Sequence, residues 1–256
     1  MIFLYNLLYL FFMRNSILFF IKLWGKPDSG KWEQVYGWPA HYGIIWRSTY
    51  HQHTSQKSGR VWLYLAGLEG GFQSGTGAES EAALVVSAGS GTAMVAARGG
   101  EARHITGSAV GGGTLQGLGR LLLGTADAPT IDLLAQQGNA NAADLTLAEA
   151  IGGTVGSLPA DANAVNFGRL ARHAVDLSPE DLAAAIVRLV GQVIAVIAIN
   201  AARAEHLEQI VVLGHLVDLP AMRQVLHATA GYYQASITIP PRPGLGTAIG
   251  ALLCAQ

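Results

Sequence analysis

Short apolar runs separated by glycine turns dominate the middle of the chain. The apolar run ALVVSA (83–88) ends at Gly89-Ser90-Gly91-Thr92, and AMVAA (93–97) then resumes it. A further glycine turn leads into ARHIT (102–106). Apolar runs bounded in this way are typical of buried strands joined by tight turns. The pattern therefore predicts a strand, a tight loop, a second strand, a turn and a third strand.

Helical patterns follow this strand-rich stretch. Gly111-Gly112-Gly113-Thr114 precedes LQGLGRLLLG, which predicts a helix, and Asp127-Ala128-Pro129 predicts the start of another helix that Gly138 closes. We also expect a helix over residues 161–174. Further on, the pattern predicts a strand, a helix, a strand and a helix over residues 209–214, 220–230, 236–240 and 245–255. Alternation of strands and helices predicts an α/β fold.

The longest predicted helix begins at Ser178-Pro179-Glu180-Asp181. Serine is a good N-cap, proline suits the first helical position, and acidic residues favour the first turn. The helix should run to about Glu205 and is apolar enough to resemble a membrane span. Because Arg188 and Gln192 interrupt the apolar run, we expect a core helix or a dimer helix instead.

Composition changes at about residue 60. All four lysines lie before that point, all five tryptophans lie at or before Trp62, and Ala40 is the only alanine before residue 61. We interpret residues 1–60 as an atypical hydrophobic segment of foreign composition, produced by a frameshift, a misplaced start or a fusion. A tryptophan-rich first lobe is the alternative. We expect residues 61–256 to form the functional domain.

Residues 1–24 are strongly hydrophobic, but Arg14 lies near their middle. No basic residue precedes Arg14 and no A-x-A cleavage pattern follows, so a signal peptide is not indicated. Membrane contact through this segment is possible but not favoured, since spanning helices rarely carry a central arginine.

Charge and cysteine content exclude other classes of function. The net charge of −1 argues against nucleic-acid binding. The single cysteine, Cys254, excludes an internal disulfide and a cysteine zinc site, and is consistent with the cytoplasmic location that we expect. His51 and His53 have no carboxylate or cysteine near them in sequence, so we interpret them as solvated loop residues. No metal ligand is predicted.

The two glycine loops are the candidate binding elements. A Rossmann fingerprint fails because Met94 occupies its third glycine position, and a P-loop lysine is missing because no lysine follows Lys57. A hairpin turn can still offer backbone N–H groups to an anion, and the loop at 111–114 would add a helix N-terminus. A structural turn and a flexible connector are the alternatives. Two such loops close together favour phosphate binding.

Six motifs, two of which contain the glycine loops, resemble in their order and spacing a type II pantothenate kinase over about residues 84–254. They are SAGSGT (87–92), RHITGSAVGGGTLQGLG (103–119), LLAQQGNANAADL (133–145), ANAVNFGRL (162–170), VVLGHLVDLPAMR (211–223) and GTAIGALL (246–253). The resemblance implies an actin-like (ribonuclease H-like) kinase fold, of which the C-terminal lobe is recognisable. It also implies a homodimer, and ATP-dependent phosphorylation of pantothenate, the first step of coenzyme A synthesis, with Mg²⁺.

The resemblance also implies roles for individual residues. Gly89, Ser90, Gly91 and Thr92 would form the second phosphate loop, and Gly111, Gly112, Gly113 and Thr114 would hold further phosphate oxygens. Gly214 resembles the glycine of the adenosine-binding turn. Arg103 and His104 lie where the family carries a basic pair beside the substrate, although the second position is usually arginine.

Departures from the family pattern lie upstream. No Asp-x-Gly-Gly-Thr loop occurs in residues 1–62, and Leu63 stands where the pattern Glu-Phe-x-Ala-x-x-x-Gly places a catalytic glutamate. Leucine cannot accept the hydroxyl proton, and Glu69 falls on an unspecified position. We therefore expect the N-terminal lobe to be missing or atypical. A catalytically deficient family member and an actin-like sugar or N-acetylglucosamine kinase are the alternative functions. Residues 133–170 favour pantothenate over sugar.

Overall fold

A computed structural model describes residues 82–98, 101–172 and 176–246 of the 256-residue chain. The predictions for residues 1–60, for Leu63 and for most of the helix over 245–255 lie outside these residues. The boundary at residue 60 therefore stays a prediction.

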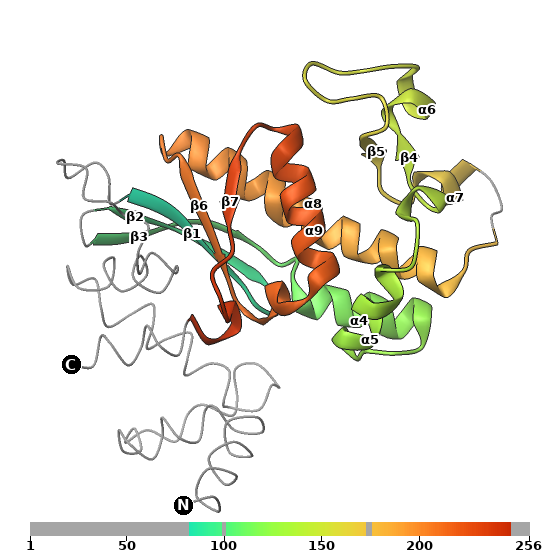
Figure 1. The fold of residues 1–256 in the computed structure, drawn as a ribbon, viewed down its shortest axis with the longest axis horizontal. Coiled ribbons are helices and arrows are strands. Elements are labelled where there is room, and N and C mark those ends of the chain that lie inside the picture. Colours follow the sequence, from blue (N-terminus) through green and yellow to red (C-terminus); the bar gives the residue numbers. More distant parts are fainter. Residues whose placement is uncertain (1–81, 99–100, 173–175, 247–256) are drawn as a thin grey trace, which may run out of the picture. The chain divides into compact units, whose positions relative to one another are not determined.

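A five-stranded mixed sheet forms the centre of the described chain (Figure 1). Its order is β3-β2-β1-β6-β7, in which β1, β2 and β3 are antiparallel while β6 and β7 run parallel to β1. The strands comprise Ala82–Ala88 (β1), Thr92–Arg98 (β2), Glu101–Ser108 (β3), Gln209–Leu213 (β6) and Ser236–Thr238 (β7). The predicted strands and the α/β class are confirmed.

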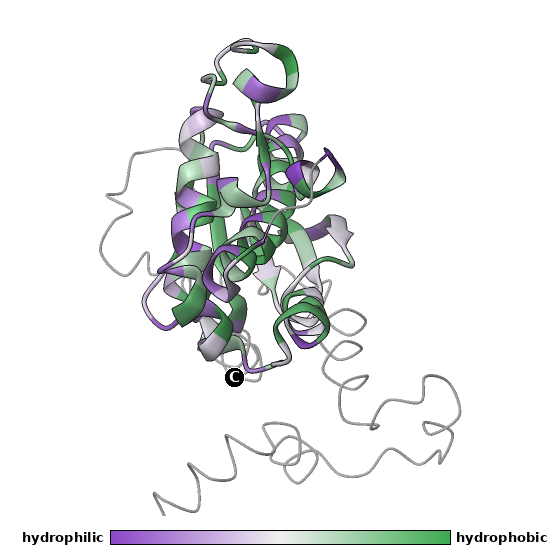
Figure 2. Ribbon diagram, turned by 90° about the vertical axis from the view of Figure 1, so that its right-hand side faces the viewer, coloured by the Kyte–Doolittle hydropathy of each residue, from purple (hydrophilic) through white to green (hydrophobic). Residues whose placement is uncertain are grey.

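Four main helices pack with this sheet. They are α4 (Gly112–Leu123), α5 (Ala128–Ala135), α8 (Pro179–Ala204) and α9 (Pro220–Tyr232). The main hydrophobic core joins one face of the sheet to these helices through residues such as Leu84, Leu115, Ile131, Ile194 and Leu226. Figure 2 shows hydrophobic residues concentrated along the inner parts of the helices and the sheet.

Helix α8 starts as its sequence predicts. The Ser178 hydroxyl accepts from the Asp181 N–H at 3.1 Å, and Pro179 occupies the first turn. The helix is long and apolar enough to cross a membrane, with a mean hydropathy of 2.4 in its most apolar window, yet 61% of that window is buried within the protein. It contacts α4, α5, α9 and the sheet. Helix α8 is therefore a core helix, as predicted because Arg188 and Gln192 interrupt its apolar run.

A smaller antiparallel pair is formed by β4 (Leu145–Thr146) and β5 (Asn163–Val165), with short helices α6 (Leu147–Ile151) and α7 (Gly168–Arg172) beside it (Figure 1). The predicted helix over 161–174 is wrong in its first half, where residues 163–165 form β5, whereas residues 168–172 form α7. Between them, Phe167 adopts a φ of 57°, a left-handed conformation that interrupts a helix. The Phe167 N–H donates to the Asp144 carboxylate at 2.7 Å, which holds this break in place.

Candidate functional site

The two glycine loops contact each other through their backbones. The Gly112 N–H donates to the Gly89 carbonyl at 2.7 Å, and the Gly113 N–H donates to the Ser90 carbonyl at 2.9 Å. The Thr92 hydroxyl adds a bond of 2.9 Å to the Val110 carbonyl. The two loops therefore lie directly against each other, and their part in phosphate binding stays a prediction.

Close backbone approach explains the glycines at the start of α4. A Cβ atom on Gly111 would lie 2.7 Å from the Ser90 carbonyl oxygen and 2.9 Å from that of Gly89, closer than real Cβ atoms come. Added Cβ atoms on Gly112 and Gly113 would meet the same carbonyl oxygens at 3.0 and 3.1 Å. These glycines therefore allow one loop to sit directly on the other.

This contact changes which N–H and hydroxyl groups of the two loops could bind phosphate. Two N–H groups of the first turn of α4 donate to carbonyls of the hairpin loop, so they are not free for phosphate oxygens. Thr92 is buried and its hydroxyl donates to the Val110 carbonyl, whereas Ser90 is exposed. The positive end of the α4 dipole still faces this region. The sequence showed glycine and hydroxyl residues but not which of them hold the loops together.

Gly214 lies at the same end of the strands as the two glycine loops. It follows β6, whose Leu213 pairs with Ser87 of the parallel strand β1. With a φ of 108° it adopts a conformation that favours glycine, and an added Cβ would lie 2.2 Å from the Ala88 carbonyl oxygen. Both glycine loops and Gly214 thus meet at the carboxyl ends of parallel strands, where open α/β sheets commonly bind ligands.

The basic pair lies elsewhere on the sheet. His104 precedes Ser108 by four residues along β3, or about 13 Å at about 3.3 Å per residue, and Ser108 pairs with Thr92 beside the hairpin loop. Arg103 donates to the Glu205 carboxylate at 2.7 Å, at the end of α8. The structure therefore does not bring Arg103 to the glycine loops, and the part of Arg103 and His104 in catalysis stays a prediction.

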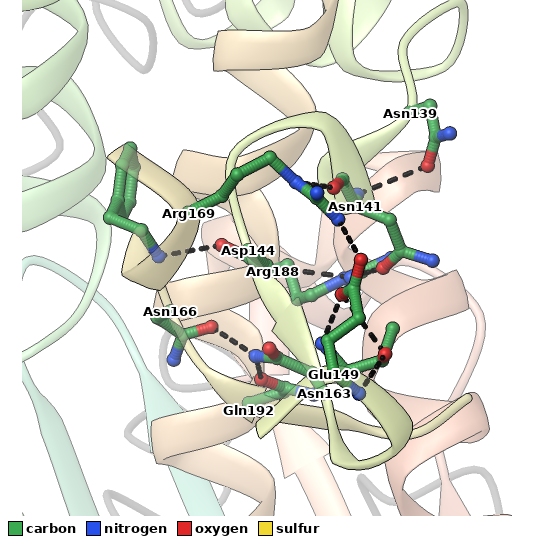
Figure 3. Close-up of polar contacts among 11 residues, drawn as sticks. Asn139, Asn141, Asp144, Glu149, Asn163, Asn166, Arg169, Arg188 and Gln192 are labelled. Carbon is green, nitrogen blue, oxygen red and sulfur yellow. Dashed lines mark hydrogen bonds and ion pairs between the residues drawn. The ribbon is translucent and has the colours of Figure 1, made fainter. Parts of the chain in front are cut away.

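Sequence reasoning missed a polar cluster between α8 and the segment from Asn139 to Arg169 (Figure 3). Asp144 is fully buried there and forms an ion pair with Arg188 at 3.4 Å. Burial raises the pKa of the Asp144 carboxyl, although the Phe167 N–H and Arg188 oppose this shift. Arg188 also donates to the Asn141 side chain. The arginine inside an apolar helix was the signal that could have found this cluster.

Glu149 stabilises the exposed side of the same cluster. Its carboxylate accepts from the Thr146 N–H at 3.0 Å and pairs with Arg169, while the Thr146 hydroxyl accepts from the Glu149 N–H. Thr146 and Glu149 thus form a capping box at the start of α6. The bonds from Thr146 and Arg169 lower the pKa of Glu149 to about 2.

Comparison with known proteins identifies the family. A family model described as Fumble matches residues 69–238. The chain belongs to this type II pantothenate kinase family. Type II pantothenate kinase of Staphylococcus haemolyticus (strain JCSC1435) is 33% identical over 145 residues, or 56% of this chain and 54% of the relative. The enzyme of Staphylococcus aureus (strain USA300) is 34% identical over 132 residues, or 51% and 49%. The chain spans about half the length of these relatives.

Two solved structures are distantly similar. The activator of the 2-hydroxyisocaproyl-CoA dehydratase from Clostridium difficile, with bound ADPNP, is 15% identical with a TM-score of 0.41, over 67% of this chain and 59% of that one. Component A of the Acidaminococcus fermentans (R)-2-hydroxyglutaryl-CoA dehydratase is 14% identical with a TM-score of 0.44, over 76% and 66%. These likenesses are too distant to bear on function. The described chain has a mixed sheet with helices, in agreement with the actin-like fold that the resemblance implies.

Proposed function

We propose that the chain binds ATP at the carboxyl ends of strands β1 and β6, where the two glycine loops and Gly214 meet. We further propose that its reaction is the ATP-dependent phosphorylation of pantothenate to 4'-phosphopantothenate, the first step of coenzyme A biosynthesis. The observation that carries the proposal is the direct backbone contact between Gly111–Gly113 and Gly89–Ser90, in a chain of this family. It supports a rigid platform that holds the exposed Ser90 hydroxyl beside the start of α4, where an anion would bind.

Each part of this edge has an assigned task in the proposal. Ser90 contributes an exposed hydroxyl, and the start of α4 contributes its dipole to the phosphates. Gly214 lets the turn after β6 pass close to Ala88, and the nucleoside would lie beside this turn. Mg²⁺ supplies charge neutralisation on the phosphates when bound. Within the described ranges no group of three or more His, Cys, Asp or Glu side chains could hold a metal ion, so no residue is assigned to it.

Leu63 favours a second candidate, a family member with deficient catalysis. The resemblance places a general base at this position, and loss of such a base costs about 10²–10⁴ in rate. The missing Asp-x-Gly-Gly-Thr loop would remove a further contact to the γ-phosphate. We propose that the chain binds ATP but transfers phosphate slowly. We also propose that residues 61–256 form the kinase-like domain and that residues 1–60 are a separate, atypical segment.

The remaining proposals concern partner and location. We propose a cytoplasmic protein that dimerises through α8 and does not depend on membrane contact through residues 1–24. Support for the dimer comes from the length of α8 and from Val193 and Val196, which the described chain buries only in part. The burial of most of the apolar window of α8 supports a core helix rather than a membrane span. The motifs over 133–170 support pantothenate rather than a sugar as the acceptor.

Transfer of labelled γ-phosphate tests the proposed reaction. The purified chain is incubated with ATP, Mg²⁺ and either pantothenate or N-acetylglucosamine, and the products are separated. We expect slow formation of phosphopantothenate only, and no rescue by Leu63→Glu alone, because the first loop is still missing. Turnover of roughly 1–10³ per second would contradict deficient catalysis, and transfer to the sugar would contradict the substrate.

A further inference from the structure

An exposed histidine lies at the turn that follows strand β6. His215 comes directly after Gly214 and begins the short 3₁₀ helix η3 (His215–Asp218). The next residue, Leu216, reaches the start of α4, where its side chain lies 4.0 Å from the place that a Cβ atom on Gly112 would take. His215 is therefore at the same end of the strands as the proposed ATP site.

One ring nitrogen of His215 is held by a neighbouring carboxylate. Its Nδ1 atom lies 3.0 Å from Oδ2 of Asp218, within the same short helix. A carboxylate accepts hydrogen bonds but does not donate them, so Nδ1 carries the ring proton and donates it to Asp218. In the neutral ring the other nitrogen, Nε2, then has no proton and is an acceptor. Asp218 thus fixes which edge of the ring accepts a hydrogen bond.

This histidine–aspartate pair packs against Gly244. A Cβ atom added to Gly244 would lie 2.3 Å from the His215 Nδ1 atom and 2.4 Å from Oδ2 of Asp218, so a larger residue there would displace the pair. Gly244 belongs to the 3₁₀ helix η4 (Pro243–Leu245), and the Gly214 N–H donates to the Pro243 carbonyl at 2.9 Å. The ring is therefore held in place by two short helices that are bonded to each other.

The accepting edge of the ring is open to a ligand. The His215 side chain is 81% exposed, and none of the described residues forms a hydrogen bond with its Nε2 atom. The ring is neutral and lies beside a carboxylate, whose charge repels an anion. This position therefore suits a neutral hydrogen-bond donor better than a phosphate group.

We infer that His215 positions the nucleoside of the bound nucleotide by accepting a hydrogen bond at Nε2. The inference rests on the proposed ATP binding and assigns to that site a side chain that contacts the nucleoside rather than the phosphates. Adenosine carries neutral donors of two kinds, the 6-amino group and the ribose hydroxyls, and both have the chemistry that Nε2 recognises. Asp218 orients the ring and fixes its proton.

Calorimetric titration of the full chain tests the inference at about pH 8.5, above the range of about 5–8 in which histidine usually gains its second proton. The ligands are ATP, purine riboside triphosphate, which lacks the 6-amino group, and the 2′-deoxy and 3′-deoxy forms of ATP, which each lack one ribose hydroxyl. His215→Phe keeps a planar ring but has no acceptor, so ATP should bind about three- to tenfold more weakly, the loss expected for one neutral hydrogen bond. His227→Phe makes the same change at an exposed position of α9 and should bind ATP as the wild type does.

The analogues separate a direct contact from a general effect on the turn. In the wild type, the analogue that lacks the contacted donor should bind more weakly than ATP by a similar factor. In His215→Phe this difference should disappear, because the hydrogen bond is already lost. A loss with purine riboside triphosphate assigns the contact to the 6-amino group, and a loss with a deoxy nucleotide assigns it to that hydroxyl. Asp218→Ala should also weaken ATP binding, because the ring loses the partner that fixes its proton.

The inference is overturned if His215→Phe binds ATP as tightly as the wild type does. It is also overturned if every analogue loses the same factor in His215→Phe as in the wild type, since the effect would then be structural. Unchanged ATP binding by Asp218→Ala would refute the role of Asp218. Absence of nucleotide binding by the wild type would overturn the proposed function as well, so the two failures can be told apart.

Discussion

Two glycines, Gly111 at the N-cap of α4 and Gly117 within the helix, should respond in opposite ways to substitution by alanine. Gly111 is buried against the hairpin loop, and an added Cβ would lie 2.7 Å from the Ser90 carbonyl oxygen, whereas Gly117 is exposed with no atom within 4 Å of an added Cβ. We expect Gly111→Ala to lower the free energy of unfolding by about 1–3 kcal/mol through overpacking. Gly117→Ala should raise it by up to about 1 kcal/mol through helix propensity. Urea unfolding measures both, and equal effects would contradict this account of the loop contact.

Glu149 makes stability depend on pH at the acidic end. Because its pKa falls from 4.5 to about 2 on folding, its ionised form contributes stability that is present above pH 4.5 and is lost as the pH falls toward 2. We expect Glu149→Gln to be less stable than the wild type at pH 6 and to converge with it at low pH. Thermal unfolding across this range tests the prediction, and a difference that is constant with pH would refute it.

The contribution of Asp144 to stability should change with pH in the opposite direction to that of Glu149. Burial raises its pKa above the ordinary 3.8, so the folded state retains the proton longer than the unfolded state. Its contribution to stability is therefore fully present below pH 3.8 and is lost as the pH rises through the raised value. Asp144→Asn should lack this decline with pH, which unfolding of both proteins between pH 3 and pH 8 would show. A decline that persists unchanged in Asp144→Asn would assign it to another group.

Helix α9 depends on a residue from another helix for its first turn. Its N-cap, Leu219, has no side-chain acceptor, and the buried Asp132 of α5 instead accepts from the Ala221 N–H at 2.9 Å and from Gln136 at 2.7 Å. Asp132→Ala should lower the free energy of unfolding by about 1–3 kcal/mol, because it leaves a buried N–H unpaired. Asp132→Asn keeps an oxygen and should cost less. Denaturant unfolding compares them, and equal stability of all three proteins would show that this bond does not matter.

Local patterns predicted most elements because those elements follow from their own residues. The three antiparallel strands are bounded by glycine turns, and α8 carries its own serine cap and proline start. Strand β5 was missed because its partner, β4, lies far away in sequence and because a tertiary bond from Phe167 to Asp144 breaks the helical pattern. Which elements pair at such a distance cannot be read from periodicity.

The candidate site was predictable in position but not in detail. Glycines after β1, before α4 and after β6 pointed to one edge, and parallel pairing of β1 with β6 places them there. That the Gly112 and Gly113 N–H groups donate to the hairpin loop depends on tertiary contact. The ion pair of Arg103 with Glu205 likewise joins a strand to a helix end about 100 residues later.

For the molecule as a whole, the proposed dimer is the first prediction to test. Val193 and Val196 are only partly buried within the described chain, although α8 is otherwise a core helix, so a second copy could cover this face. Light scattering at high concentration should give twice the mass of the chain, and Val196→Glu should reduce it toward the mass of one chain. A single-chain mass for the wild type would contradict dimerisation.

The central claim is that the edge formed by Gly89–Thr92, Gly111–Thr114 and Gly214 binds the phosphates of ATP. Calorimetric titration of the full chain with ATP and Mg²⁺ tests it most directly. We predict one ATP per chain for the wild type and for Gly117→Ala, and at least tenfold weaker binding for Gly111→Ala, because the displaced loops no longer form the platform. Circular dichroism verifies that each variant is folded under the conditions of the titration. Absence of ATP binding by the wild type, or unchanged binding by a folded Gly111→Ala, would contradict the account.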